Sequence, residues 1–380
     1  MIQKLEKYKS GSYRNQGDFS SFIPSSINAD WTWETPIINS LLNRASSELG
    51  GLNTFAELVP DIDTYIMMHI QVEANKSNKI EGTNTTIEED MMPIEDVNPE
   101  HRDDAMEVSN YIKALNYGID RIQQDDFPFT TRLLREIHKI LLIGVRGEHK
   151  TPGEFRTSQN FIGGSMPSNA KYVPPAVPDM QDALGDFDKF MNRENDNLPV
   201  LIRLAMMHYQ FETIHPFLDG NGRIGRIMIP LYLLSQKELA KPCFYISYYF
   251  EEHRQEYYEA LQNVREKNDM IGWICFFLKA SIETAQTAKK KFRLAVEQVN
   301  WYKDYLMNKR TGADSLRTVI RAMYSRPVAS VNQLMELTGL SAATVNNVVK
   351  ILTADHILQE LTGNRRNRIF VLKDYLRVFS

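Results

Sequence analysis

Apolar residues recur at every third or fourth position in several long stretches of the chain, a spacing that places them on one face of an α-helix. The clearest stretches are residues 106–122, 131–142, 200–214 and 271–285. Together they predict a mainly α-helical core over residues 103–287. Residues 288–308 are rich in Lys, Arg and Gln and predict a long helix that joins this core to a C-terminal tail.

Two segments depart from the helical pattern. Glycines and prolines surround two short β-prone pieces, residues 159–162 and 171–173, which together predict a β-hairpin. In the tail, a first helix precedes a helix-turn-helix pattern whose second helix is capped by Ser341, followed by two strands joined by Gly363 and Asn364. This order resembles a winged helix.

These patterns divide the chain into four predicted segments. An N-terminal region with one amphipathic helix is followed by a helical core that the hairpin interrupts, then by a helical linker and the winged-helix tail. The segments cover residues 1–100, 101–290, 291–310 and 311–380.

Charge separates the tail from the rest of the chain. The 380 residues carry a net charge of −4, which gives no overall nucleic-acid signature, yet the residues from 310 onward hold ten Lys or Arg against five Asp or Glu. Arg365, Arg366 and Arg368 at the wing tip are candidates for contacts with DNA phosphates. Winged helices equally serve as protein-binding or dimerising modules, so DNA, a protein partner and a homodimer all stay open.

Composition limits the class of protein further. With 43% hydrophobic residues the chain is long enough for two or three domains with buried cores. Only Cys243 and Cys275 are present, so no disulfide framework is expected, and no paired-cysteine or HExxH spacing indicates a structural zinc site. The N-terminus has no apolar core for a signal peptide, and no run approaches the length of a membrane helix. We therefore expect a soluble cytoplasmic protein that does not contact membranes.

Residues 215–226, which read HPFLDGNGRIGR, concentrate the polar chemistry of the chain. Gly220, Asn221 and Gly222 allow successive backbone N–H groups to point into one concavity at the start of a helix, where phosphate binds well. Arg223 and Arg226 are three residues apart, so on a helix they share a face and can bind phosphate oxygens. The stretch predicts a site for a nucleotide triphosphate.

Two further residues of this stretch supply reactive groups. Asp219 lies at the mouth of the turn, where its carboxylate can hold a Mg²⁺ that also takes phosphate oxygens. The imidazole of His215 lies upstream, in a position to remove a proton from an incoming hydroxyl. The combination favours phosphoryl or nucleotidyl transfer, in which positioning and charge neutralisation provide most of the catalysis.

The same twelve residues resemble the signature of the Fic family, HxFx(D/E)GNGRxxR. The matching residues are His215, Phe217, Asp219, Gly220, Asn221, Gly222, Arg223 and Arg226. The resemblance implies an enzyme that moves AMP from ATP onto a protein hydroxyl of Ser, Thr or Tyr, with His215 as base, Asp219 as Mg²⁺ ligand and the turn and arginines around the phosphates. The intact GNGR argues against the Doc-like branch, which transfers phosphate, and Phe217 is expected to anchor the loop in the core.

A second motif lies upstream, in the run KSNKIEGTNTT. Ser77, Glu81 and Gly82 resemble the inhibitory motif of the same family, (S/T)xxxE(G/N). Apolar spacing before it predicts a helix that ends at Glu81 with Gly82 as its cap. The resemblance implies that Glu81 pairs with Arg226, and an arginine held by a carboxylate cannot also hold the outer phosphate of ATP. The enzyme would then restrain itself.

The predicted hairpin resembles the Fic flap, which lies over the active site and positions a target backbone by strand addition. Its lead-in and end match at Gly153, Phe155, Arg156, Tyr172, Pro174 and Pro175. The resemblance also implies nucleotide contacts from the backbone of Asn160, Phe161, Ile162 and Gly163. Tyr257 and Tyr258 resemble an aromatic pair that lines the nucleotide pocket in some relatives, although Arg265 stands where some of those relatives carry asparagine.

Three functions are consistent with these motifs. The first is a self-inhibited protein adenylyltransferase, which modifies a target protein or itself and whose tail selects a location or partner. The second is a DNA-binding regulator in which the Fic region only senses nucleotide. The third is removal of AMP from a modified protein, with Glu81 positioning water. A sensor needs no base, so the presence of His215 favours an enzyme.

Overall fold

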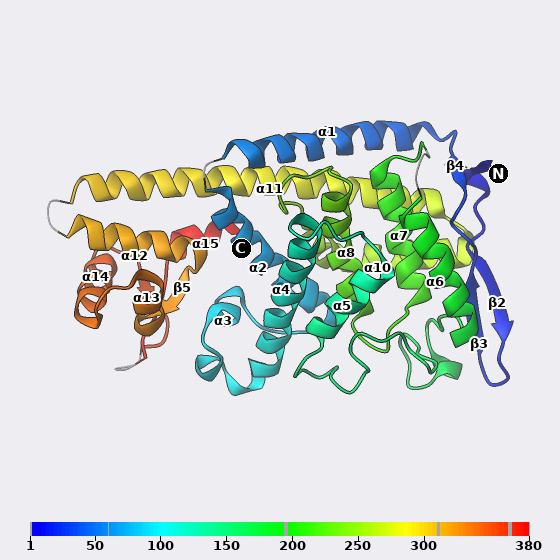
Figure 1. Cartoon of the computed structure of the whole chain (residues 1–380), viewed down its shortest axis with the longest axis horizontal. Coiled ribbons are helices and arrows are strands. Elements are labelled where there is room, and N and C mark those ends of the chain that lie inside the picture. The colour runs from blue at the N-terminus through cyan, green and yellow to red at the C-terminus, as the bar shows by residue number, and fades with distance from the viewer. Residues whose placement is uncertain (1, 60, 194–196, 310–311, 364–366, 380) are drawn as a thin grey trace. The chain divides into compact units, whose positions relative to one another are not determined.

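The computed structural model describes residues 2–59, 61–193, 197–309, 312–363 and 367–379 (Figure 1). It contains two compact units, a first unit of Met1–Thr54 with Asn110–Ala285 and a second unit of Phe55–Ser109 with Gln286–Ser380. The unit boundaries fall within α1 (Pro36–Leu58), α4 (Arg102–Gln123) and α11 (Met270–Met307). The two units do not correspond to the four segments predicted from the sequence, and those segments stay a prediction.

The first unit is mainly helical, as the periodicity predicted. Its remaining helices are α5 (Thr131–Leu141), α6 (Val177–Met191), α7 (Val200–Ile214), α8 (Asn221–Ser235), α9 (Ser247–Glu252) and α10 (Arg254–Lys267), with 3-10 turns at Leu5–Lys7 and Pro167–Asn169. Helix α7 packs against α6 and α8 and is buried around its circumference from Leu201 to Ile214. A helix buried on all sides is the centre of a core, and α7 carries His215 at its end.

Two pairs of strands near the N-terminus were not predicted. Strands β2 (Gly11–Asn15) and β3 (Ser20–Pro24) form an antiparallel hairpin, and β1 (Ile2–Lys4) pairs in parallel with β4 (Asp30–Thr32). The backbone N–H of Phe22 in β3 donates to the carbonyl oxygen of Val173 (2.9 Å). Because the strands are short and β2 is mostly exposed, the sequence gives little alternation from which to predict them.

The second unit contains α2 (Ile62–Glu81), α3 (Ile87–Met91) and the tail. The tail elements are α12 (Ala313–Ser325), β5 (Val328–Ser330), α13 (Val331–Thr338), α14 (Ala342–Ala354), β6 (Gln359–Glu360), β7 (Ile369–Val371) and α15 (Lys373–Phe379), and 3-10 turns lie at Ile94–Asp96 and Pro99–His101. Helices α12 and α15 both pack against α2. The ring of His69 in α2 lies 4.3 Å from Phe292 and 5.4 Å from Phe379, centroid to centroid.

The tail confirms the expected helix order and adds a strand. The side chain of Ser341 accepts a hydrogen bond from the backbone of Thr344, so it caps α14 as predicted. The antiparallel sheet has three strands in the order β5-β7-β6, whereas the sequence indicated two. The third strand, β5, has only three residues, of which the last, Ser330, is also the N-cap of α13, and this is too short for a pattern. Asn364, Arg365 and Arg366 lie outside the described residues.

The core helix and the predicted linker helix are one element. Helix α11 runs without interruption over 38 residues, from the predicted core into the predicted linker, and the boundary between these two segments stays a prediction. Its amino-acid composition changes along its length, but no glycine, proline or cap interrupts it near that point. Within the described residues, no helix combines the length and apolar character needed to cross a membrane.

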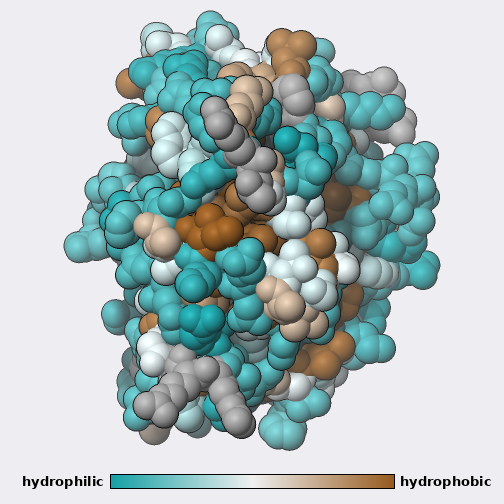
Figure 2. Space-filling view, turned by 90° about the vertical axis from the view of Figure 1, so that its left-hand side faces the viewer, coloured by the Kyte–Doolittle hydropathy of each residue, from teal (hydrophilic) through white to brown (hydrophobic). Residues whose placement is uncertain are grey.

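Figure 2 shows a small apolar area between hydrophilic residues on the face presented by the C-terminal helices. In these helices, the large apolar side chains with the highest exposure include Trp301, Met307 and Leu337. Isolated exposed apolar side chains are normal in proteins. Most of the rest of this face is hydrophilic, with further scattered apolar residues towards its edges.

Candidate active site

His215 follows directly after α7 and turns the chain out of the helix. Its backbone is left-handed (φ 49°, ψ 60°), while its N–H still donates to the carbonyl of Phe211 (2.9 Å). This conformation is uncommon for a residue other than glycine and persists only where surrounding contacts hold it. The imidazole therefore projects from the end of the central, fully buried helix, and 19% of the side chain is exposed.

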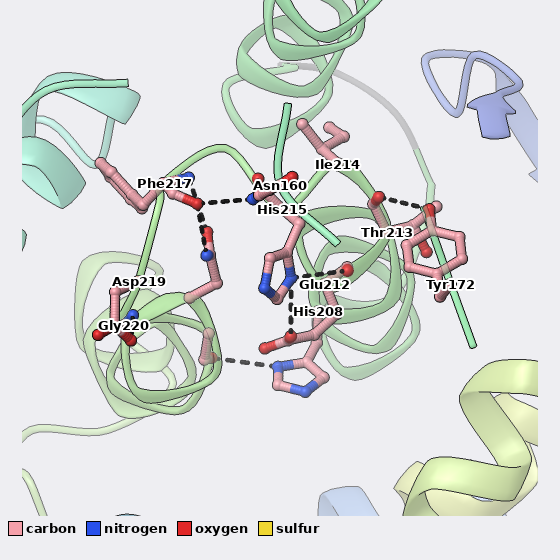
Figure 3. A network of polar contacts seen from close by, with 12 residues as sticks. Asn160, Tyr172, His208, Glu212, Thr213, Ile214, His215, Phe217, Asp219 and Gly220 are labelled. Carbon is pink, nitrogen blue, oxygen red and sulfur yellow. Dashed lines mark hydrogen bonds and ion pairs between the residues drawn. The ribbon is translucent and has the colours of Figure 1, made fainter. Parts of the chain in front are cut away.

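The imidazole of His215 is oriented by Glu212, one turn earlier in α7. Its Nδ1 lies 3.3 Å from the Glu212 carbonyl oxygen and 3.9 Å from the carboxylate Oε2 (Figure 3). Because both partners are acceptors, the proton belongs on Nδ1 and the lone pair on Nε2. This is the tautomer of a general base, and the nearby carboxylate stabilises the imidazolium that forms. Glu212 was not predicted from the sequence, although its spacing of three residues from His215 was a usable signal.

Asn221 closes the loop between α7 and α8. Its Oδ1 accepts from the N–H of Phe217 (2.8 Å), and its Nδ2 donates to the carbonyl of the same residue (2.9 Å). The ring of Phe217 is fully buried and stacks on His138 with a centroid separation of 3.8 Å. Phe217 is thus the core anchor that was expected, and the Asn221 side chain fixes the shape of the loop.

His138 in α5 supports the other end of this loop. Its Nδ1 accepts from the N–H of Gly153 (2.8 Å), so its Nε2 donates to the carbonyl of Asp219 (3.0 Å). Burial lowers the pKa of His138 to about 4, which keeps the ring neutral as this pattern requires. His138 was not predicted from the sequence, because it lies far along the chain from the signature and its helical stretch carries no local sign of a polar role.

The start of α8 has the geometry that was predicted for an anion-binding turn. Gly220 is the residue before the helix and has a left-handed backbone (φ 77°), which favours glycine. The first N–H groups of a helix have no partner within it and lie at the positive end of the helix dipole. Arg223 and Arg226 in the first turns of α8 are 4% and 1% exposed. The structure thus brings the predicted turn and both arginines to one helix end, a geometry suited to phosphate.

The Asp219 carboxylate fits the role of a Mg²⁺ ligand. Its Oδ1 accepts from the N–H of Gly220 (2.6 Å) and lies 3.6 Å from Nη2 of Arg223, while 44% of the side chain is exposed. In the described part of the chain no cluster of three or more His, Cys, Asp or Glu residues suits a metal ion. One accessible carboxylate matches Mg²⁺, which keeps several waters and takes its other ligands from phosphates.

The segment from Arg156 to Tyr172 satisfies the carbonyl groups at the end of α7. Helix ends leave such groups without partners inside the helix. The acceptors are five consecutive carbonyl oxygens, those of Thr213, Ile214, His215, Pro216 and Phe217. Their donors are the Tyr172 hydroxyl, the Arg156 side chain and backbone, and Nδ2 of Asn160 (Figure 3 shows the first and last of these).

Where the hairpin was predicted, the structure has one isolated antiparallel bridge, between Ile162 and Tyr172, and no strands. Asn160 is 8% exposed, whereas Phe161 and Gly163 are exposed. Gly163 adopts φ 70°, so glycine suits the turn that follows the bridge. These residues adjoin the His215 loop through Asn160, while their predicted nucleotide contacts and the flap itself stay predictions.

The two tyrosines of the predicted aromatic pair differ in environment. Tyr257 is 1% exposed and its hydroxyl donates to Nε2 of His208 (2.8 Å), whereas Tyr258 is 45% exposed. Nδ1 of His208 donates in turn to the carbonyl of Gly225 in α8 (3.1 Å). The guanidinium of Arg265 lies 4.0 Å from the Tyr172 ring centroid, next to the end of α7. Tyr257 is thus joined to α8 through His208, and of the two tyrosines only Tyr258 is exposed.

The predicted inhibitory motif lies in the second unit. Helix α2 ends at Glu81, and Gly82 follows in the left-handed conformation (φ 105°) with its N–H directed to the carbonyls of Asn78 and Lys79. The expected helix end and glycine cap are therefore confirmed. Ser77 lies one turn earlier on α2. The pairing of Glu81 with Arg226 stays a prediction.

Sequence comparison finds two matches within the chain. Residues 128–233 match the Fic/DOC family, and residues 39–120 match the Fic/DOC family N-terminal region. Protein adenylyltransferase Fic from Culex quinquefasciatus is 30% identical over 187 residues, and the protein of the same name from Aedes aegypti is 29% identical over 187 residues. These alignments cover 48% of this chain but 33% and 34% of the relatives, so the chain spans about a third of their length.

Solved structures show the same fold. A Fic family protein from Desulfovibrio desulfuricans G20 is 22% identical, with a TM-score of 0.55 over 90% of this chain and 97% of that one. A Fic domain-containing signaling protein from Bacteroides thetaiotaomicron is 19% identical, with a TM-score of 0.52 over 67% of this chain and 96% of that one. The chain therefore has a Fic-like helical fold and carries, at residues 128–233, a segment that matches the Fic/DOC family.

Proposed function

We propose that this protein transfers AMP from ATP to the hydroxyl of a Ser, Thr or Tyr side chain in a target protein. The observation that carries the proposal is the position of His215, whose Nε2 bears the lone pair at the end of α7, in the same closed loop as the anion-binding start of α8. The names of the relatives from Culex quinquefasciatus and Aedes aegypti support the same activity. A nucleotide sensor needs the anion site but has no use for an oriented base.

In the proposed reaction, Nε2 of His215 takes the proton of the target hydroxyl while the hydroxyl oxygen attacks the α-phosphorus of ATP. The new P–O bond forms as the bond to the β-phosphate oxygen breaks, and pyrophosphate leaves with that electron pair. The first N–H groups of α8, with Arg223 and Arg226, stabilise the charge on the phosphates. A Mg²⁺ held by Asp219 would supply further charge neutralisation there.

The same proposal includes internal restraint by Glu81. Its support is the end of α2, where Glu81 is the last helical residue and Gly82 turns the chain. A carboxylate paired with Arg226 would occupy the guanidinium that the outer phosphate of ATP requires. The alternative function is removal of AMP from a modified protein, in which Glu81 would position the attacking water.

Intact-mass measurement of the purified chain tests the transfer and the restraint together. After incubation with ATP and Mg²⁺ and a panel of candidate target proteins, we expect the Glu81→Gly variant to add AMP to itself or to a target, and the wild type to add less. His215→Ala in the variant background should abolish the added mass while ATP binding persists. AMP incorporation that survives His215→Ala would remove the assigned base, and equal labelling of wild type and Glu81→Gly would remove the restraint.

The tail supplies a second candidate function. The succession of α12, β5, α13, α14, β6 and β7, with its antiparallel sheet, supports a winged helix in the tail. The surplus of basic residues favours binding to DNA phosphates, whereas a protein partner would need no such surplus. In either case we propose that the tail selects where the enzyme acts.

A further inference from the structure

Arg156 lies just before the predicted hairpin, and its side chain binds the backbone at the end of α7. Its guanidinium and backbone N–H donate to the carbonyl oxygens of His215 (3.0 Å), Ser158 (3.3 Å), Pro175 (2.5 Å), Ile214 (3.5 Å) and Pro216 (2.9 Å). Ser158 and Pro175 lie on the two sides of the predicted flap. One side chain thus joins both ends of the flap segment to the backbone of the proposed base.

The environment of Arg156 is unusual for a cation. Its side chain is among the largest that are fully buried, with 1% of the residue exposed, and burial lowers its pKa to about 10. All its hydrogen-bond partners are carbonyl oxygens, several of them at the C-terminal end of α7, where the helix dipole favours positive charge. Five N–H groups in a fixed plane can serve several carbonyls together, which the ammonium of lysine cannot do in the same geometry.

His215 needs such support because of its backbone. Its left-handed conformation is sparsely populated and persists only where the surroundings over-determine it. Two donors converge on the His215 carbonyl oxygen, Nε of Arg156 at 3.0 Å and Nδ2 of Asn160 at 3.1 Å. Rotation of that peptide would break both bonds and redirect the imidazole.

We propose that Arg156 is a positioning residue that aligns His215 for catalysis. Because Arg156 also binds the carbonyls of Ser158 and Pro175, this alignment depends on the position of the predicted flap segment. The inference rests on the proposed transfer reaction and identifies how its base is held. The anion site has its own supports, because Asn221 closes the loop onto Phe217 and His138 holds the carbonyl of Asp219. Loss of Arg156 should therefore reduce chemistry without an equal loss of ATP binding.

The test uses the whole 380-residue chain with Glu81→Gly and, in addition, Arg156→Lys, Arg156→Gln or Asn160→Ala. We expect both Arg156 variants to lower kcat for AMP transfer on the order of 10- to 100-fold, as misplacement of a catalytic group does. The dissociation constant for a non-hydrolysable ATP analogue should stay unchanged. Asn160→Ala should lower kcat in the same direction. Arg135→Lys is the matched control, because Arg135 donates to the nearby Gly153 carbonyl (2.8 Å) but is 38% exposed and does not contact α7 carbonyls.

Two results would overturn the proposal. One is an unchanged kcat in both Arg156 variants, and the other is a parallel loss of kcat, analogue binding and melting temperature, which would indicate only a structural role. Failure of the proposed function is seen separately, as a Glu81→Gly parent that transfers no AMP in a His215-dependent way. In that case the ¹⁵N chemical shifts of the His215 imidazole test whether Arg156 positions this ring. Identical shifts with and without Arg156→Lys would contradict the proposed role of Arg156.

Discussion

At the scale of residues, the site depends on pairs that lie far apart in the sequence. His138 and Asp219, Arg156 and His215, and Asn160 with the same histidine are joined by direct hydrogen bonds. Each of these bonds gives a part-buried backbone carbonyl a donor within the protein, and the His215 carbonyl receives two. Loss of such donors costs free energy. The signature loop is therefore stabilised largely by residues that do not belong to the signature.

Gly225 shows why a glycine stands within the signature helix. A Cβ built at this position would overlap the Glu212 carboxylate, which is buried and lies beside His215. We expect Gly225→Ala to gain helix propensity of about 1 kcal/mol but to displace Glu212, so that AMP transfer falls while the melting temperature changes little. Activity assays and thermal unfolding of the same samples check this.

Gly185→Ala is the matched control for that prediction. Gly185 is an exposed helical glycine in α6, and a Cβ there would meet no atom within 4 Å. The control should therefore raise stability by about 1 kcal/mol and leave activity unchanged. Full activity in Gly225→Ala would show that the Glu212 position is unimportant for the base.

At the scale of elements, α2 is the helix on which the tail is packed. Helices α12 and α15 contact it, and His69 in α2 lies against the rings of Phe292 and Phe379. Burial lowers the pKa of His69 to about 3, with a smaller effect of the nearby Lys291. The same helix ends in Glu81, so the stability of this packing and the proposed restraint involve one element.

Acid should weaken this packing through His69. Its pKa is about 3 in the folded protein and near 6.5 in the unfolded chain, so between these values the unfolded chain binds an extra proton. The stabilisation is complete above pH 6.5 and is lost as pH falls towards 3. From pH 7 to 5 we expect His69 to account for a loss of about 2 kcal/mol.

Urea unfolding at pH 7 and pH 5 measures that loss. The variant His69→Phe keeps an aromatic ring without a titrating group and should lose about 2 kcal/mol less than wild type over this interval. The exposed His149 provides the control, and His149→Gln should behave like wild type. Equal pH dependence of wild type and His69→Phe would rule out this contribution.

At the scale of the whole molecule, the charge of the tail contrasts with that of the remaining chain. The tail carries a surplus of five positive charges within a protein of net charge −4. Arg365 and Arg366, which lie outside the described residues, belong to the predicted wing. A protein that neutralises DNA phosphates releases counterions, and its affinity then falls steeply with salt.

Salt titration of DNA binding therefore tests the tail. If the tail binds DNA, replacing Arg365 and Arg366 by Ala should weaken binding and reduce the slope of log affinity against log salt by about 2. The variant Arg377→Ala, which removes an exposed arginine paired with Asp374 in α15, is the control for general loss of charge. Absent or salt-insensitive binding would favour a protein partner for the tail.

The sequence by itself determined the features that depend on nearby residues. Apolar periodicity predicted the helices of the core, and the glycine and serine signals predicted the end of α2 and the start of α14. The residues from His215 to Arg226 identified the candidate site and its resemblance to a family. These signals are local because a helix face, a cap or a turn is specified within a few residues.

Only the tertiary structure decided how the site is held. Arg156, Asn160 and His138 reach the His215–Asp219 loop across 55 to 81 positions of sequence, and no local pattern indicates which buried carbonyl each will meet. The tautomer of His138 likewise follows from burial and from two backbone partners. The physical reason is that desolvation and the satisfaction of backbone polar groups are properties of the packed chain.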